Sequence, residues 1–157
     1  MGDEEAMPCR ACGGGLEEVE VEGRLFWMCR GCGSTLVEQR DLIPVLTSAA
    51  RAIADAVSFD EHIDPVPPAP APACPDCDRK MEAFGYMGTH LAFPARCAPC
   101  SLVWMGPEVM GVMTLLFART NLRHDTRVAD MQAQLAEMDR RMTAVVMNRV
   151  RESWMMR

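Results

Sequence analysis

The chain has 157 residues and a formal net charge of −6, and eight of its residues are cysteines. This length suits one ordinary domain or two small ones, and small domains commonly need a metal or disulfides to supplement a limited core. The longest apolar run, at 109–118, is about half as long as a membrane-spanning helix, and the acidic N-terminus is unlike a signal peptide. We therefore expect a cytoplasmic protein without a membrane partner, in a reducing compartment where paired cysteines favour metal over disulfides.

The charge is uneven along the chain. Residues 1–64 contain 13 acidic and 5 basic residues, a balance of −8, whereas residues 65–157 contain 9 acidic and 11 basic residues, a balance of +2. Affinity for nucleic acid depends on basic surface. The first half is therefore a poor candidate for nucleic-acid binding, and the second half is only a weak one.

The first cysteine block occupies residues 1–41. Two Cys-x-x-Cys pairs are separated by 16 residues, within which apolar and polar residues alternate around Glu22-Gly23. Alternation about a glycine turn predicts a β-hairpin. The segment 42–58 follows, with apolar residues at helical spacing and Pro44 where the first turn of a helix accepts proline. We expect a helix there.

A proline-rich segment separates this block from a second one. Residues 65–73 contain five prolines, which disfavour helix and predict an extended, semi-rigid linker over 59–73. The second block, 74–106, again has two Cys-x-x-Cys pairs, now 19 residues apart. The two blocks are therefore internal repeats. Whether they contact each other across the linker is left open by the sequence.

Two helices are expected after the second block. Residues 107–120 are apolar nearly all round, which predicts a buried helix. The segment 125–157 predicts a long amphipathic helix, because its apolar residues follow the three-four spacing of the a and d positions of a coiled coil. These residues are Val128, Met131, Leu135, Met138, Met142 and Val145. Such a narrow stripe predicts a homo-oligomer or a protein partner bound through 125–157; the alternative is that the helix packs on its own chain.

The eight cysteines divide into two groups with the spacing of metal ligands. The groups are Cys9, Cys12, Cys29 and Cys32, and Cys74, Cys77, Cys97 and Cys100. Two Cys-x-x-Cys pairs at this separation are typical of a zinc site, since zinc binds four thiolates in a tetrahedron. We expect two zinc ions per chain. The alternatives are disulfides, four-thiolate iron as in rubredoxin, and a thioredoxin-like redox pair.

The residues around the cysteines also indicate a family. The first block opens with MPCRACGGGL (7–16) and closes with CRGCGSTLVE (29–38), and the second opens with CPDC (74–77) and closes with CAPCSLVWM (97–105). Both blocks resemble the transcription-factor-IIB-type zinc ribbons of bacterial proteins. Asp78 and Ser101 stand where the family has glycines that suit a left-handed backbone. The resemblance implies two four-cysteine zinc ribbons, and it implies little about function because such folds are widely reused.

Together these patterns predict a small, metal-stapled α+β protein with two zinc ribbons, each followed by a helix, and a long C-terminal helix. Closed four-thiolate sites leave no position for substrate, and His62, His90 and His124 are isolated in sequence, so we expect no enzyme. The predicted function is that of a non-catalytic interaction or adaptor protein. The alternative is a nucleic-acid-binding or transcription-associated protein, because 119–157 contains 8 basic residues against 5 acidic ones.

Overall fold

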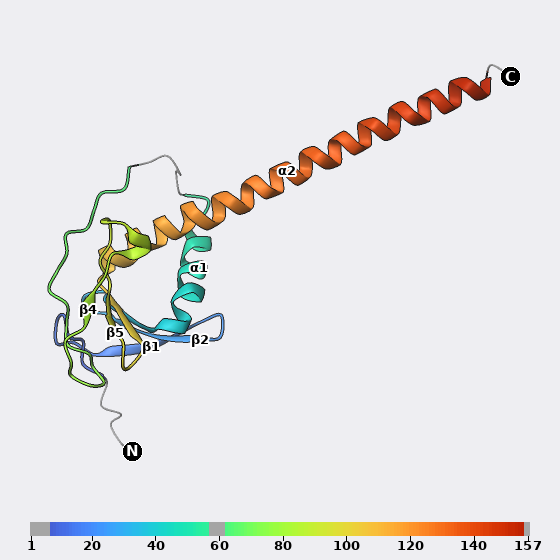
Figure 1. Ribbon diagram of the computed structural model, residues 1–157. Helices are drawn as coiled ribbons and strands as arrows, with labels where there is room; N and C mark the ends of the chain where they lie inside the picture. The colour runs from blue at the N-terminus through green and yellow to red at the C-terminus, as the bar shows by residue number, and fades with distance from the viewer. Residues whose placement is uncertain (1–6, 57–61, 156–157) are drawn as a thin grey trace. The chain divides into compact units, whose positions relative to one another are not determined.

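A computed structural model describes residues 7–56 and 62–155, and it leaves out the side chains at 123–127, 146 and 148–155. The chain divides into two compact units, Met1–Arg119 and Thr120–Arg157. Figure 1 gives the course of the chain within each. The first unit contains both cysteine groups, and the second consists of the greater part of one long helix.

The first unit belongs to the α+β class and is built on an antiparallel sheet, as the sequence predicts. The strands are β1 (Leu16–Val21), β2 (Arg24–Cys29), β3 (Thr35–Glu38), β4 (Glu82–Ala83), β5 (Ala95–Cys97) and β6 (Leu102–Met105). The helices are α1 (Leu42–Ile53), α2 (Pro107–Met155), and the short 3-10 helices η1 (Gln39–Asp41) and η2 (Tyr86–Gly88). Among the described residues, no helix is long and apolar enough to cross a membrane.

The two cysteine blocks join in one sheet. Its six strands run in the order β1-β2-β3-β6-β5-β4, so the last strand of each block lies at the centre. There β3 pairs antiparallel with β6, with Leu36 opposite Trp104 and Val37 opposite Val103. Each block therefore contributes three strands to the sheet, and the question that the sequence leaves open is answered by a direct strand pairing.

The hairpin in the first block forms where the alternating pattern predicts it. Strands β1 and β2 pair along their whole length, from Leu16 opposite Cys29 to Val21 opposite Arg24. The two turn residues between them, Glu22 and Gly23, have φ angles of 51° and 75°. Positive φ at both central residues is the geometry of a two-residue turn that matches the twist of the flanking strands.

The central strands are buried on both faces. Paired residues of an antiparallel ladder lie on the same face, and successive residues alternate. Leu36 and Trp104 therefore share one face, where they belong to a buried cluster with cysteines of both groups. Val37 and Val103 lie on the opposite face and are buried as well. A sheet interior on both sides explains why these strands read as continuous apolar runs rather than as alternating ones.

Helices supply further buried apolar residues of the first unit. Helix α1, which lies beside the sheet in Figure 1, buries Leu42, Val45, Leu46 and Ala50. This spacing places the four side chains along one stripe of the helix. The helix predicted at 42–58 thus begins at Leu42 and ends at Ile53, and its last predicted residues, 57 and 58, lie outside the described part. The helices predicted separately at 107–120 and 125–157 form one helix, α2, which also includes residues 121–124 and runs to Met155; residues 156 and 157 lie outside the described part.

The proline-rich segment is extended and lies alongside the second block, to which it is hydrogen-bonded. The Val66 amide donates to the Leu91 carbonyl at 2.9 Å, and the Met81 amide donates to the Pro72 carbonyl at 3.0 Å. A bridge between Ala73 and Lys80 continues this pairing. Proline lacks an amide hydrogen, so the segment meets its neighbours at a few positions and forms no continuous ladder.

The shared sheet predicts that the two blocks unfold together. Leu36 is fully buried at the β3–β6 junction, so Leu36→Ala should cost about 2–5 kcal/mol of unfolding free energy. Hydrogen exchange measured by mass spectrometry should show amides of β1–β2 and of β5–β6 losing protection to the same extent. Leu25→Ala is the control, because Leu25 is 45% exposed. Loss of protection confined to β1–β3 would contradict the shared-sheet account.

Candidate metal centre

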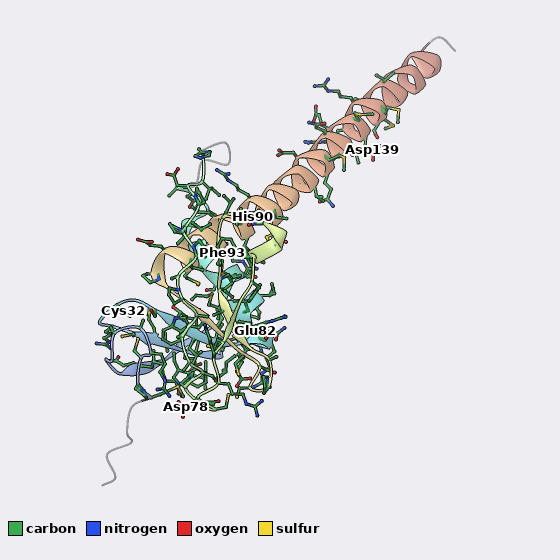
Figure 2. The ribbon with its side chains drawn as sticks, turned by 60° about the vertical axis from the view of Figure 1, so that its left-hand side comes forward. Cys32, Asp78, Glu82, His90, Phe93 and Asp139 are labelled. Atoms are coloured by element: carbon green, nitrogen blue, oxygen red, sulfur yellow. The ribbon has the colours of Figure 1, made fainter. Side chains whose placement is uncertain are left out.

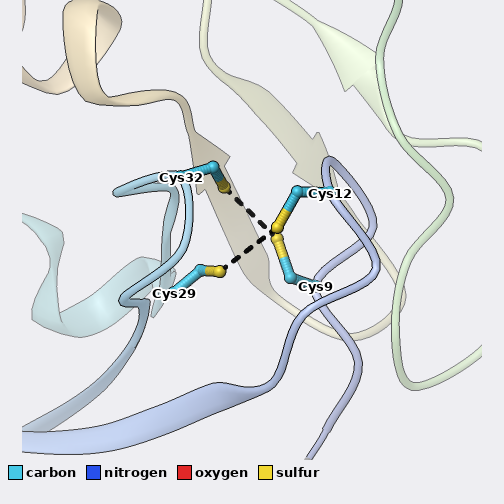
Figure 3. Close-up of side chains that lie close together, drawn as sticks. All are labelled: Cys9, Cys12, Cys29 and Cys32. Carbon is cyan, nitrogen blue, oxygen red and sulfur yellow. Dashed lines mark hydrogen bonds between the residues drawn. The ribbon is translucent and has the colours of Figure 1, made fainter.

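The first cysteine group is assembled from two loops that flank the β1–β2 hairpin. Cys9 and Cys12 precede β1, while Cys29 ends β2 and Cys32 follows it, so the hairpin brings the two pairs together (Figure 3). The sulfur atoms of Cys9 and Cys32 are 3.6 Å apart, and those of Cys12 and Cys29 are 3.5 Å apart. All four sulfurs lie within 4.8 Å of one another.

The second group repeats this arrangement around β5. Cys74 and Cys77 precede β4, while Cys97 ends β5 and Cys100 lies in the turn before β6. The sulfurs of Cys77 and Cys97 are 3.5 Å apart, and again all four lie within 4.8 Å of one another. The structure thus brings together all eight cysteines that the sequence assigns to metal, in the two predicted groups.

The sulfur spacing fits one tetrahedral ion in each group. A metal–sulfur distance of about 2.3 Å places the four sulfurs of a regular tetrahedron about 3.8 Å apart. A disulfide needs about 2.05 Å between its sulfurs, and all eight cysteines are free thiols in this structure. Each group could therefore hold one metal ion with its four sulfurs as ligands.

The backbone turns that present the sulfurs have a common geometry. In three of the four Cys-x-x-Cys turns, the amide four residues after the first cysteine donates to that cysteine's carbonyl, as from Gly13 to Cys9 at 2.8 Å. The residue after the second cysteine has positive φ in every turn: Gly13 (76°), Gly33 (74°), Asp78 (57°) and Ser101 (54°). Asp78 and Ser101 thus adopt the left-handed conformation of the glycines they replace. In the fourth turn the Ser101 amide donates to the Ala98 carbonyl at 3.3 Å rather than to the carbonyl of the first cysteine.

The thiols of the first group have different proton affinities. Burial raises the pKa of Cys9 to about 12. Side-chain and backbone hydrogen bonds with Ser34 lower the pKa of Cys32 to about 6, and the Cys32 sulfur lies 3.2 Å from the Ser34 hydroxyl oxygen. No sequence signal singles out Ser34 beyond its position two residues after a cysteine. Its hydrogen bonds favour the thiolate form of Cys32.

The thiols of the second group also differ from one another in pKa. A backbone hydrogen bond from Arg79 lowers the pKa of Cys77 to about 7, whereas contact with the Cys77 sulfur raises the pKa of Cys100. Four thiolates this close repel one another unless a cation lies between them. Metal binding to either group must therefore release protons, so acid weakens it.

Two interactions tie the groups to each other. Arg10, within the first Cys-x-x-Cys turn, forms an ion pair with Asp78, which directly follows Cys77. Beneath them, buried cysteines of both groups share a cluster with Leu36 and Trp104. Figure 2 shows Cys32 and Asp78 on the first unit. The ion pair was not expected from the sequence, because the two residues come from separate blocks and meet only in the joined sheet.

Other polar residues of the described chain do not converge in this way. His62 is exposed and lies 3.6 Å from the Asp64 carboxylate, and exposed His90 contacts the Phe93 ring. The side chain of His124 is outside the described residues. A groove of about 750 Å³ lies beside the proline-rich segment, and its charged lining residues are Arg10 and Glu108.

Each group should hold one metal ion independently of the other's ligands. Cys29→Ser and Cys97→Ser each remove one buried sulfur from a four-sulfur group, and the metal content measured by native mass spectrometry should fall from two ions per chain to one. Ser48→Ala, remote from either group in sequence, is the control and should leave both ions. A single substitution that leaves two tightly held ions would show that its cysteine is not a ligand.

The strained turn after Cys100 predicts a stabilising substitution. Ser101 has a φ of 54°, a conformation that costs a residue with a Cβ about 1–2 kcal/mol. Ser101→Gly should raise the unfolding free energy of the metal-loaded protein by about 0.5–1 kcal/mol, measured by denaturant titration. The reverse change, Gly13→Ser, introduces a Cβ with nothing within 4 Å and should destabilise by a similar amount. Destabilisation by Ser101→Gly would show that the hydroxyl matters more than the backbone.

Comparison with protein-family models, with curated proteins and with solved structures found no match to this chain. The assignment of the site therefore depends on the eight sulfurs themselves: their spacing in sequence, their convergence within 4.8 Å, and the repeated turn that presents them. On these grounds the first unit contains two groups of four cysteines that could hold metal ions.

Proposed function

We propose that this protein is a non-catalytic adaptor in which two zinc ribbons form a rigid head and the C-terminal helix binds another protein chain. The observation that supports it most directly is the contrast between the two units. In the first, apolar residues are buried around two four-cysteine groups. In the second, large apolar residues lie exposed along one stripe of a helix.

The zinc ribbon assignment is supported by the local architecture of both blocks. In each, a Cys-x-x-Cys turn precedes strands that end in a second such turn, which is how a ribbon places four sulfurs around one ion. Zinc is favoured over iron because it binds four thiolates tetrahedrally without redox chemistry, and no thiol is left over in either group. Reduced thiols are consistent with a cytoplasmic location.

A non-catalytic role follows from the proposed use of the cysteines. If both groups are occupied, every thiol of the chain is a ligand and none is a nucleophile. A four-thiolate ion has no open position for water or substrate. The exposed histidines His62 and His90 neighbour Asp64 and Phe93 rather than a shared pocket. The metals in this proposal stabilise the fold.

The stripe on α2 is the proposed binding surface. We call it the seam: Val128, Met131, Leu135, Met138, Met142 and Val145. Five of its six side chains are 57–64% exposed, and Val128 is half-buried. A continuous apolar stripe of this kind is costly to leave in water and marks an interaction site. Methionine packs adaptably and is frequent on such surfaces.

Binding to nucleic acid is less well supported. Arg140 and Arg141 both pair with Glu137, at 3.1 and 3.0 Å, so part of the basic charge of α2 is already neutralised. The strand β1 exposes Glu17, Glu18 and Glu20, which repel phosphate. A protein bound mainly to phosphates would lose affinity steeply with salt.

The adaptor proposal predicts that one charge in the seam abolishes association. Leu135→Glu places a carboxylate at the centre of the seam and should weaken association at least about 100-fold, because a buried charge without a partner costs several kcal/mol. A chain that ends at residue 124 should lose association altogether. Mass in solution, measured by light scattering and native mass spectrometry, reports both results together with any bound protein or nucleic acid.

Ala133→Glu is the matched control. It introduces the same charge on the exposed opposite side of the helix, and like Leu135→Glu it places a glutamate four residues before an acidic residue, Glu137 in one case and Asp139 in the other. It should leave association unchanged. If Leu135→Glu and the truncated chain keep the mass and the bound molecules of the original protein, the adaptor proposal fails. Salt-sensitive nucleic acid in the complex would favour the alternative function.

A further inference from the structure

The order of residue types along the seam indicates which protein chain could bind to it. In heptad terms Val128, Leu135 and Met142 are a positions, and Met131, Met138 and Val145 are d positions. Read from either end, the order of residue types is nearly the same: valine, methionine, then leucine or methionine at the centre. No charged residue interrupts it. A stripe with this symmetry can fit a copy of itself turned end to end.

We propose that two copies of this chain pair through the seam as an antiparallel dimer with a two-fold axis near residues 136–137. This deepens the adaptor proposal and depends on it, since it names a second copy as the protein bound. In such an isologous interface, residue i meets residue j of the partner and j meets i. Each a position then lies beside a d position of the other copy. The layers are Val128 with Val145, Met131 with Met142, and Leu135 with Met138.

The flanking residues fit the same arrangement. In an antiparallel pair, e positions meet e positions and g positions meet g positions. Gln132 then faces Asp139 (labelled in Figure 2), and Gln134 faces Arg141. Each charge meets an amide that can accept or donate a hydrogen bond, and no like charges face each other. The Nε–H of Arg141 donates to the Glu137 carboxylate at 3.0 Å. The guanidinium has four further N–H donors that can bond to Gln134 of the second copy.

A parallel pair fits the residue types of the seam less well. Parallel dimers favour β-branched residues at a and leucine at d, whereas here the d positions are Met131, Met138 and Val145. The mixed a–d layers of an antiparallel pair remove this conflict.

One exposed position discriminates between the two orientations. In the antiparallel dimer, Gln134→Glu creates two attractive contacts with Arg141, and Gln134→Arg creates two repulsive ones. In the parallel dimer Gln134 faces Asp139, so both signs reverse. Analytical ultracentrifugation of the full, metal-loaded chain at low salt should therefore give a dimer dissociation constant about two- to tenfold lower for Gln134→Glu and about two- to tenfold higher for Gln134→Arg. High salt should remove the difference.

Gln134 is exposed, so both variants should fold as the original does, which circular dichroism checks. The reversed order of affinities would establish a parallel pair and overturn the proposal. Equal affinities would place position 134 outside the interface and overturn it too. A chain that stays monomeric at all concentrations would overturn self-pairing alone: the adaptor proposal would then still stand if Leu135→Glu, but not Ala133→Glu, releases a different bound protein.

Discussion

The pairing of β3 with β6 is the interaction on which the rest of the first unit depends. Four residues on each side form the ladder, and through it two short three-stranded blocks become one sheet with both faces buried at its centre. Neither block has enough apolar surface to make a sizeable core alone, because small domains bury a low fraction of their surface. Joined, they share one cluster that includes buried cysteines of both groups. The pairing also brings Arg10 to Asp78, so the two cysteine groups lie in one framework.

Within that framework the sulfurs are held by the backbone rather than by long side chains. Each Cys-x-x-Cys turn closes with a residue in the left-handed conformation, and hydrogen bonds of the turn fix the direction of the cysteines. Other hydrogen bonds distinguish the thiols: those that Ser34 makes to the Cys32 sulfur and the Arg79 backbone makes to the Cys77 sulfur lower the pKa of these two thiols. A bound ion would convert the remaining thiols to ligands and cross-link residues far apart in sequence, which is how a structural metal stabilises a small domain.

The second unit differs from the first in that its apolar residues are exposed rather than buried. Its helix has one apolar stripe, and five of the six seam residues are more than half exposed, so a second surface that covers the stripe would stabilise the helix. If both cysteine groups hold metal ions, the first unit would be a rigid, metal-stapled body, which suits the adaptor role that we propose. In the antiparallel dimer that we propose, each seam covers the other.

The sequence alone determined the features that depend on local pattern. Cysteine spacing identified both four-cysteine groups, alternation about Glu22-Gly23 located the first hairpin, and helical periodicity located α1 and the seam, because each signal is carried by residues near one another in the chain. Only the tertiary structure decided that the two blocks form one sheet, since β3 and β6 are distant in sequence and their apolar runs suit pairing with many partners. For the same reason the Arg10–Asp78 ion pair became visible only once the chain was folded. The contact of Ser34 with Cys32 is local in sequence, but it depends on the geometry of the turn, which only the structure shows. Positions such as Ser101, where a residue other than glycine adopts positive φ, were decided by the turn that the cysteines impose and not by the residue's own preference.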